Sequence, residues 1–306
     1  MAVLGRRGVG RGAVAAALAN SGIAVAAGEA EADVRVLVIA ETLKPEDRAL
    51  LRGSSGGSGV GIVVLNKADL SGADPGGPLV RAHRRAAELA VVAGRPVVPM
   101  IAHLATIGLD DANVGALHVL AAHPADLTST DSFVAGVHQL PVEVRKGLLD
   151  KLDRFGLAYA LAALAAGGTA STVTRQLREV SQVDSLVQRL KAALAPFRYH
   201  RARGAMLELR ALAAQSGDDQ LDTFLNSDAV VVALMSAAAD VVLAAGFTLD
   251  SDRHGDQHGQ CDAQSGPQLR RAERWNGYAR GPVNLLHQRC ATDIVRGSLR
   301  LHTSVR

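Results

Sequence analysis

The chain has 306 residues, enough for two domains, and small aliphatic side chains must fill its core because 48% of its residues are hydrophobic but only 3% are aromatic. Its formal net charge is only +3, which argues against nucleic acid as a partner. Two cysteines, Cys261 and Cys290, in a chain of this length and the lack of a signal-peptide pattern favour a reducing, cytoplasmic location.

The N-terminal residues predict a strand, a glycine-rich loop and a helix, in that order. Residues 2–4 are apolar, and an alanine-rich helical pattern covers residues 13–20. Between them, Gly5 and Gly10 fit the Gly-x-x-x-x-Gly spacing of a phosphate-binding P-loop, whose backbone N–H groups curl around phosphates. The residues that we expect to bind phosphate are Gly5, Gly8, Gly10, Arg11 and Gly12.

The end of this loop departs from the P-loop pattern at two positions. Arg11 replaces the usual lysine and keeps the positive charge, but as a planar fork instead of a compact ammonium group. Gly12 replaces the serine or threonine whose hydroxyl binds Mg²⁺. The loop therefore predicts phosphate binding through the backbone and the helix N-terminus, without efficient metal-assisted hydrolysis.

Two other interpretations of the same loop stay open. A dinucleotide-binding fingerprint, Gly8-x-Gly10-x-x-Ala13, overlaps it, and Glu29 or Glu31 would then bind the ribose. This alternative leaves residues 66–69, which follow a predicted strand, unexplained. The other interpretation is a plain glycine-rich turn.

The next elements of the first hundred residues alternate in type. Strand patterns occupy residues 34–40 and 96–102, a short helix begins near Pro45, and residues 53–59 contain only glycine and serine. Strands that alternate with helices predict an α/β fold with a mainly parallel sheet.

The most specific motif follows a predicted buried strand at residues 61–65. Its residues, Asn66, Lys67, Ala68 and Asp69, resemble the Asn-Lys-x-Asp signature with which GTP-binding proteins recognise guanine. In that family the Asp accepts hydrogen bonds from the guanine ring N–H and amine, the Lys stem packs on the base, and the Asn ties this loop to the phosphate loop. The resemblance implies that Asn66, Lys67 and Asp69 bind guanine. The alternative is an exposed turn in which Asp69 caps a helix.

Two further segments follow this motif. Residues 78–93 predict a helix with a basic face that we expect to point to solvent. That face consists of Arg81, His83, Arg84 and Arg85. The segment Ile101-Ala102-His103 stands where the GTP-binding family places Ser-Ala-x, so the resemblance implies that the backbone N–H of Ala102 binds the guanine oxygen.

Parts of the GTPase pattern are missing. About twenty residues separate Gly12 from Val34, too few for the first switch and two further strands, and no Asp-x-x-Gly precedes the guanine motif. Asp33, Glu41 and Asp47 are candidate acids near the nucleotide, but none is assigned as a metal ligand. The sequence thus predicts a reduced, degenerate P-loop NTPase-like three-layer sandwich. Its ligand would be GTP or GDP, the use of Mg²⁺ is left open, and hydrolysis would be weak or dependent on a partner.

Beyond residue 105 the strand patterns stop and helical spacing takes over. We expect helices to begin at Pro141 and near Thr169, and a break at residues 196–199. Three segments here resemble the helical extension that follows the GTPase domain in actinobacterial dynamin-like or isoniazid-inducible-type GTPases. They are residues 152–157, 181–186 and 198–203.

The C-terminal part contains a polar loop and a basic tail. His254, His258 and Cys261 have a spacing that one zinc ion accepts, but the surrounding composition favours a flexible loop. The tail, residues 267–306, has an excess of arginine and an apolar stripe. The stripe residues are Trp275, Tyr278, Leu285, Leu286 and Ile294. Such a tail either packs back on the helical domain or contacts an anionic membrane or an acidic partner.

These patterns predict four regions. They are a degenerate P-loop GTPase-like domain (1–105), a helical domain (106–250), a flexible loop (251–266) and a basic helical tail (267–306). The first functional hypothesis is a guanine-nucleotide-binding GTPase-like protein. One alternative is a pseudo-GTPase scaffold that binds no nucleotide and acts through its helical domain, with a protein partner or by self-association. A second is a dinucleotide-binding enzyme.

Overall fold

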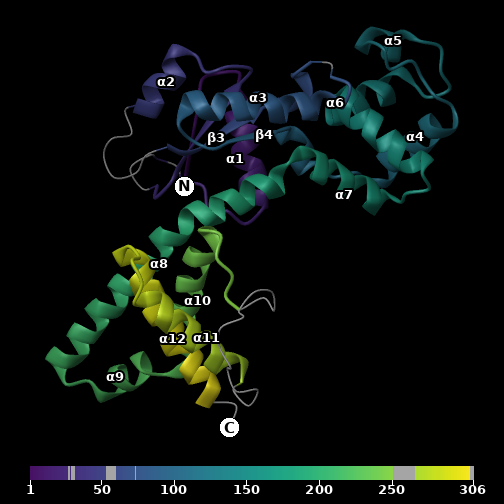
Figure 1. Cartoon of the computed structure of the whole chain (residues 1–306). Helices are drawn as coiled ribbons and strands as arrows, with labels where there is room; N and C mark the ends of the chain where they lie inside the picture. Colours follow the sequence, from purple (N-terminus) through teal and green to yellow (C-terminus); the bar gives the residue numbers. More distant parts are fainter. Residues whose placement is uncertain (27, 29–31, 53–59, 73, 251–265, 304–306) are drawn as a thin grey trace, which may run out of the picture. The chain divides into compact units, whose positions relative to one another are not determined.

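The computed structural model describes residues 1–26, 28, 32–52, 60–72, 74–250 and 266–303. Within them the chain forms one small sheet and many helices (Figure 1). Its internal contacts divide it into two compact units, Met1–Leu190 (unit 1) and Lys191–Arg306 (unit 2). Several predictions lie outside the described residues, namely the Gly/Ser loop at 53–59, the ribose acids Glu29 and Glu31, and the loop that holds His254, His258 and Cys261.

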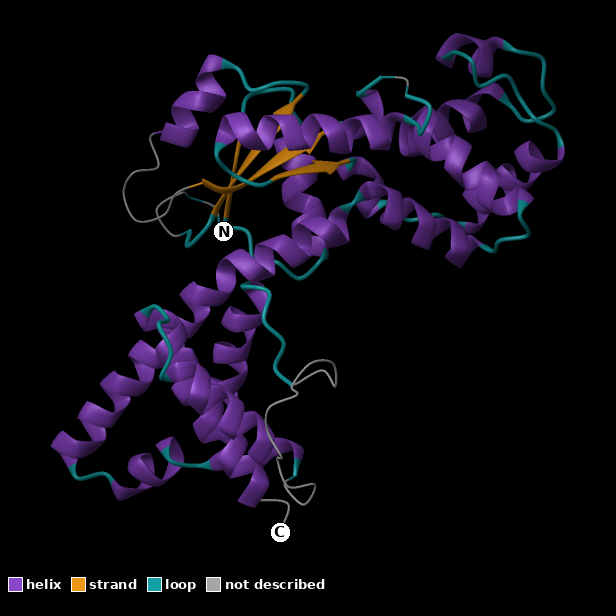
Figure 2. Cartoon of the chain, viewed as in Figure 1, coloured by secondary structure: helices purple, strands orange, loops and turns teal. Residues whose placement is uncertain are grey.

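Unit 1 contains a four-stranded sheet in which every strand is parallel to its neighbours and the strands follow the chain order (Figure 2). The strands are β1 (Ala2–Leu4), β2 (Arg35–Ala40), β3 (Val60–Asn66) and β4 (Val97–Met100). The register places Leu37 beside both Leu4 and Val63. The predicted α/β fold with a parallel sheet is confirmed. Because all strands run in one direction, their carboxyl ends lie along one edge of the sheet, where ligands of α/β proteins bind.

Helices cover both faces of this sheet. The first three are α1 (Arg11–Asn20), α2 (Pro45–Arg52) and α3 (Pro78–Ala93). Leu37 and Ile39 of β2 share a core with apolar residues of α2 and α3, and the intervening Val38 is fully buried on the other face. Figure 1 shows α1 and α3 on opposite sides of the strands.

This placement gives the first crossover an unusual hand. The strands follow the chain order, so β–α–β connections of the same handedness would place all their helices on one face of the sheet. Helices α2 and α3 share a face, whereas α1 lies on the other. The β1–α1–β2 connection is therefore opposite in hand to the two connections that follow, although nearly all such crossovers are right-handed.

The chain after β4 continues unit 1. It forms the turn η2 (Ala102–Thr106) and helices α4 (Asp111–Ala122), α5 (Thr130–Ala135), α6 (Val142–Ala165) and α7 (Ala170–Ser181). Apolar residues of α4 to α7 bury against Ala82 of α3 and Ile101 after β4. The division between the compact units therefore falls after Leu190 and not after residue 105, where the sequence predicted a domain boundary. The helix starts predicted at Pro141 and Thr169 are confirmed.

The predicted break at residues 196–199 is wrong. Helix α8 (Val183–Ser216) continues through Pro196. Proline removes one backbone hydrogen bond from a helix interior, but buried residues on both sides of it, Leu194 and Tyr199, keep the same helix packed. Burial on both sides of the proline thus outweighs its local cost.

Unit 2 contains α9 (Asp219–Leu225), α10 (Asp228–Ala244), α11 (Pro267–Ala279) and α12 (Leu285–Thr303). The last two form the basic tail, and their buried Trp275 and Ile294 share a core with residues of α10. Much of the predicted apolar stripe therefore packs inside unit 2. Contact of the tail with an anionic membrane, and self-association through the helices, stay predictions.

A buried polar network ties α8 to α12. The Tyr199 hydroxyl donates to Asp293 Oδ2 at 2.7 Å, and Arg203 Nη1 donates to the same oxygen at 2.8 Å. Burial, together with the neighbouring Asp293 carboxylate, raises the pKa of Tyr199 well above its usual value. Burial also raises the pKa of the Cys290 thiol to about 12. The network therefore has the character of a structural link between helices.

Among the described helices, none is by itself long and apolar enough to cross a bilayer. Helices α9 and α10, which are bent by 43° at their junction, meet that criterion only as a pair.

Candidate functional site

The glycine loop follows β1 at the carboxyl edge of the sheet. Gly5 has φ +147°, and a Cβ atom there would lie 2.6 Å from the Val38 carbonyl oxygen of β2. Gly10 has φ +84° and caps the N-terminus of α1, and a Cβ atom there would lie 2.2 Å from Nδ2 of Asn66. Close backbone approach at both ends thus explains why this loop contains glycine.

Asn66 joins this loop to two other predicted segments. Its Nδ2 donates to the Val9 carbonyl of the glycine loop at 2.9 Å, and its Oδ1 accepts from the Ala102 backbone N–H at 3.0 Å. The side chain lies at the end of β3 and is only 4% exposed. One amide therefore holds together the phosphate-loop candidate, the guanine-motif candidate and the segment after β4. The resemblance had implied the first of these links.

The N-terminus of α1 faces the same edge. Arg11 and Gly12, the first two residues of the helix, are exposed. No side chain among the described residues caps this end, and the first turn of the helix contains no acidic residue. The first backbone N–H groups of a helix have no partner within it and attract anions. Gly8 is also open, since no atom lies within 4 Å of a Cβ placed on it.

A buried ion pair that the sequence did not reveal anchors the glycine loop. Arg6 Nε lies 3.0 Å from Oδ1 of Asp47, whose side chain is fully buried. Asp47 also accepts from the backbone N–H of Lys44, before α2, at 3.0 Å. Its carboxylate is thus occupied by protein groups and serves as a structural anchor, not as the free acid near a nucleotide that the sequence suggested.

The other two candidate acids lie at different ends of β2. Asp33 precedes the strand, so it belongs to the amino edge of the sheet, away from the glycine loop. Glu41 follows the strand and has φ +67°. Of these two acids, Glu41 therefore lies at the edge of the sheet where the candidate site is found, and Asp33 does not.

The guanine-motif residues after Asn66 form a tight turn. Lys67 has φ +59° and begins the turn η1 (Ala68–Leu70), which contains Asp69. Burial raises the pKa of Asp69, while a backbone hydrogen bond and the charge of His103 partly offset this rise. The Nε2 atom of His103 is buried and has no hydrogen-bond partner among the described residues. Asp69 and His103, from two separate loops, thus lie close enough to interact.

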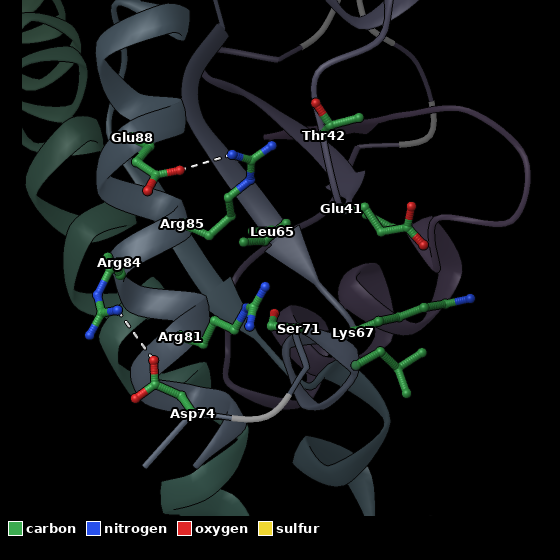
Figure 3. A pocket seen from close by; sticks show the side chains of 12 residues that line it. Glu41, Thr42, Leu65, Lys67, Ser71, Asp74, Arg81, Arg84, Arg85 and Glu88 are labelled. Carbon is green, nitrogen blue, oxygen red and sulfur yellow. Dashed lines mark hydrogen bonds and ion pairs between the residues drawn. The ribbon is translucent and has the colours of Figure 1, made fainter. Parts of the chain in front are cut away.

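A cavity with a volume of about 680 Å³ lies beside this turn (Figure 3). It is lined by the ends of β2 and β3, by η1 and by α3. The lining residues are Ala40, Glu41, Thr42, Leu65, Lys67, Leu70, Ser71, Asp74, Arg81, Arg84, Arg85 and Glu88. Lys67 is thus shared between the guanine motif and the cavity, whereas Asp69 and the glycine loop do not line it.

This cavity changes the interpretation of α3. The predicted helix at residues 78–93 is confirmed to the residue, and Arg81, Arg84 and Arg85 are exposed, as the sequence predicted; the same face also lines the cavity. The i, i+3, i+4 spacing of these arginines placed them on one helix face. That spacing did not reveal that the face borders a cavity.

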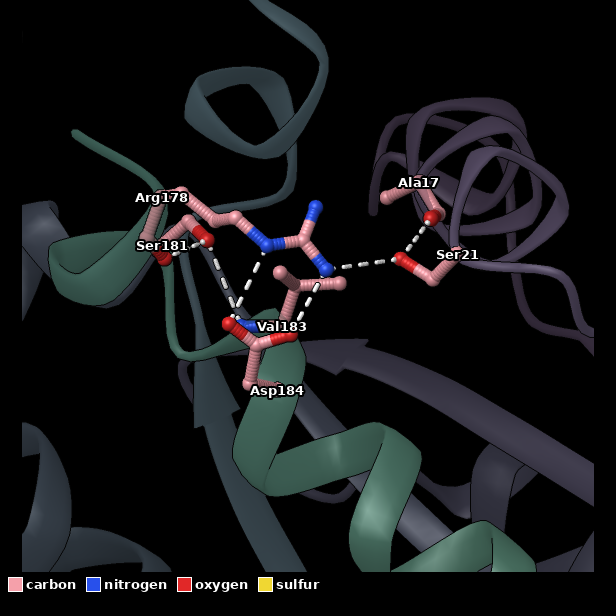
Figure 4. Close-up of polar contacts among 6 residues, drawn as sticks. All are labelled: Ala17, Ser21, Arg178, Ser181, Val183 and Asp184. Carbon is pink, nitrogen blue, oxygen red and sulfur yellow. Dashed lines mark hydrogen bonds and ion pairs between the residues drawn. The ribbon is translucent and has the colours of Figure 1, made fainter. Parts of the chain in front are cut away.

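The other end of α1 is also fixed in place (Figure 4). Arg178 of α7 donates through Nη2 to the hydroxyl of Ser21 at 3.4 Å, and through Nε and Nη2 to Asp184 of α8 at 3.1 and 2.6 Å. The Ser181 carbonyl, between these residues, accepts from the Ile101 N–H after β4 at 3.0 Å. The turn between α7 and α8 therefore supports both α1 and the end of β4.

Metal ligands give no further site. Within the part of the chain that the structure describes, no three His, Cys, Asp or Glu side chains gather as a metal centre would require.

No protein-family model, no curated protein and no solved structure matches this chain.

Proposed function

We propose that unit 1 binds a guanine nucleotide at the carboxyl ends of β1, β3 and β4. In this proposal the base binds at Asp69, and the phosphates bind the glycine loop and the N-terminus of α1. Hydrolysis is weak or depends on a partner.

One observation carries the proposal. The buried Asn66 amide bonds the glycine loop on one side and the segment after β4 on the other. Three motifs that are far apart in the sequence, and that each resemble part of a GTP-binding site, thus meet at one edge of the sheet. If the first segment were only a glycine-rich turn and the second only a helix cap, one buried asparagine would not be expected to join them.

The base site needs a donor for the guanine oxygen. The sequence assigned this role to the Ala102 N–H, but that group donates to Asn66. His103, the next residue, has a buried Nε2 without a partner among the described residues and lies near Asp69. In the proposal His103 donates to the guanine oxygen, Asp69 accepts from the ring N–H and amine, and the Lys67 stem packs on the base.

The phosphate site explains why hydrolysis is expected to be weak. The N-terminus of α1 and the open Gly8 offer backbone donors, and Arg11 offers a charge. Gly12 has no hydroxyl for Mg²⁺, and Asp47 is held by Arg6. The site therefore offers hydrogen-bond donors to the phosphates, but at these positions it lacks the groups that would position a metal ion.

The unusual hand of the first crossover supports the same proposal. The sequence lacks the two strands that a GTPase places between its first helix and the next strand of the present sheet. In a complete fold α1 would lead to those strands on the far side of β1, and right-handed connections would put it on the face opposite α2 and α3. If these two strands were lost, α1 would stay on that face, and this is where it lies.

The test is nucleotide selectivity. Fluorescent GDP and GTP should bind saturably, fluorescent ATP and NAD should not, and Mg²⁺ should change the affinity little. Asp69→Asn should weaken GDP and strengthen xanthosine diphosphate, because xanthine carries a carbonyl where guanine carries the amine and an amide N–H can donate to it. A switch of preference also shows that the variant is folded.

Other outcomes would favour the other hypotheses. NAD binding in place of GDP binding would support a dinucleotide-binding enzyme. No binding of any nucleotide, by protein with native circular dichroism, would refute the proposal and support a scaffold that acts through its helices.

A further inference from the structure

We propose that the cavity between α3 and the carboxyl ends of β2 and β3 binds the phosphoryl group of a small organic phosphate. The cavity volume of about 680 Å³ lies within the range of small-molecule pockets. Its position at the carboxyl edge of a parallel sheet is where α/β proteins bind ligands.

Charge is the first argument for an anionic ligand. Four cationic side chains line the cavity, namely Lys67, Arg81, Arg84 and Arg85. Three carboxylates, Glu41, Asp74 and Glu88, also line it, which leaves an excess of one positive charge. Three of the four cations come from one face of α3, so the positive charge gathers on one wall (Figure 3).

Carboxylates pair with two of these exposed arginines. Arg84 Nη1 lies 3.3 Å from Oδ2 of Asp74, and Arg85 Nη1 lies 2.8 Å from Oε2 of Glu88. Each of these contacts engages one nitrogen of a guanidinium group that carries five N–H donors. The remaining donors of each group can bind a phosphate, and the planar guanidinium loses less side-chain entropy for each hydrogen bond than a lysine does.

Lys67 and Arg81 complete the donor set. Lys67 forms no ion pair within the described residues and extends along the cavity from the end of β3 (Figure 3). The Arg81 guanidinium carbon lies 3.5 Å from the position that a Cβ on Gly72 would occupy, so this side chain lies over the turn after η1. The hydroxyls of Ser71 and Thr42 also line the cavity and supply neutral donors.

The rest of the lining suits an organic group. Ala40, Leu65 and Leu70 give the cavity an apolar part, and Leu70 is 67% exposed. Burying that side chain under a ligand would remove apolar surface from water. Arginine binds phosphate through paired N–H groups more specifically than lysine does. The combination of three arginines, hydroxyls and an apolar part therefore indicates an organic phosphate.

This inference stands independently of guanine binding, because Asp69 and the glycine loop do not line the cavity. The phosphoryl group has two conceivable sources. It belongs either to a separate small molecule or to a nucleotide whose base is bound near Lys67, and in the second case the nucleotide's phosphates lie in the cavity and not on the glycine loop as proposed above.

The experiment measures binding of pyrophosphate to the full chain by isothermal titration calorimetry. The cavity variant carries Arg81→Met and Arg84→Met, which keep the apolar stems and remove two guanidinium groups. The control for general charge is Arg189→Met, an exposed arginine of α8 outside the cavity. Circular dichroism verifies that each variant is folded.

The expected result is at least a tenfold loss of pyrophosphate affinity in the cavity variant and less than a twofold change in the Arg189→Met control. The proposal is overturned if the unaltered protein binds no pyrophosphate below about 1 mM. It is also overturned if the folded cavity variant keeps its affinity, or if Arg189→Met loses as much affinity as the cavity variant.

A second arm identifies the source of the phosphoryl group. GDP and guanosine are titrated into the same cavity variant. If GDP binding weakens and guanosine binding does not, the cavity holds nucleotide phosphates. If both are unchanged while pyrophosphate binding is lost, the cavity holds a separate organic phosphate. Absence of guanosine binding by the unaltered protein would refute the guanine site and leave the pyrophosphate result valid.

Discussion

Truncation of Asn66 tests the link that carries the proposed function. Asn66→Ala removes the donor to the Val9 carbonyl and the acceptor for the Ala102 N–H, both in a site where the side chain is 4% exposed. A buried polar group that loses its partner costs about 1–3 kcal/mol. Two such groups, with some access of water to the space left behind, give an expected loss of about 3 kcal/mol.

Hydrogen exchange followed by mass spectrometry is the appropriate assay, because a chain with two compact units need not unfold in one step. Peptides that cover residues 2–12 and 97–106 should exchange faster in the variant. A loss of about 3 kcal/mol in local stability corresponds to roughly a 100-fold rise in exchange rate where opening is local. Peptides from unit 2 should be unchanged.

The matched control is Asn20→Ala, which removes an exposed asparagine at the end of α1. A surface change of this kind is expected to stay within about 0.5 kcal/mol. If Asn66→Ala changes exchange in both peptides as little as Asn20→Ala does, the amide does not hold the three segments together. The argument for a shared site would then fail.

Three other perturbations test the same structure. Gly10→Ala should destabilise unit 1 by about 1–3 kcal/mol more than Gly8→Ala in urea unfolding, since both have positive φ but only the first Cβ meets another atom, at 2.2 Å. Asp47→Ala should lower the free energy of unfolding of unit 1 by about 3 kcal/mol in urea unfolding, because it leaves the partly buried Arg6 without its partner. Cys290 should resist alkylation at pH 8 until the protein unfolds, as judged by intact mass, since burial raises its pKa to about 12. Because that folded pKa lies above the ordinary value of 9.0, its contribution to stability is present below pH 9 and is lost as the pH rises towards 12.

Each of these has a contrary outcome. Equal effects of alanine at both glycines would show that the contact with the asparagine amide is unimportant. An Asp47 variant as stable as the unaltered protein would show that the ion pair does not anchor the loop. Rapid alkylation of the native Cys290 thiol would contradict its burial in unit 2.

The sequence by itself determined the local elements and the most specific motif. Apolar runs predicted the strands at 34–40 and 61–65, and alternating elements predicted a parallel sheet, as found. Periodicity and caps predicted α3 and the starts of α6 and α7. These predictions succeeded because the period of apolar residues and the chemistry of helix ends are local properties of the chain.

Only the tertiary structure decided which residues meet. The resemblance implied that Asn66 meets the glycine loop, 57 residues away, but no pattern in the sequence could join Arg6 to Asp47, which are 41 residues apart. Packing likewise carried α8 through Pro196, because buried contacts on both sides outweigh one lost hydrogen bond. The same packing moved the unit boundary to Leu190, because α4 to α7 bury apolar residues against the sheet region. It also placed the α3 arginines along a cavity, since a helical pattern fixes which side chains share a face but not what that face borders.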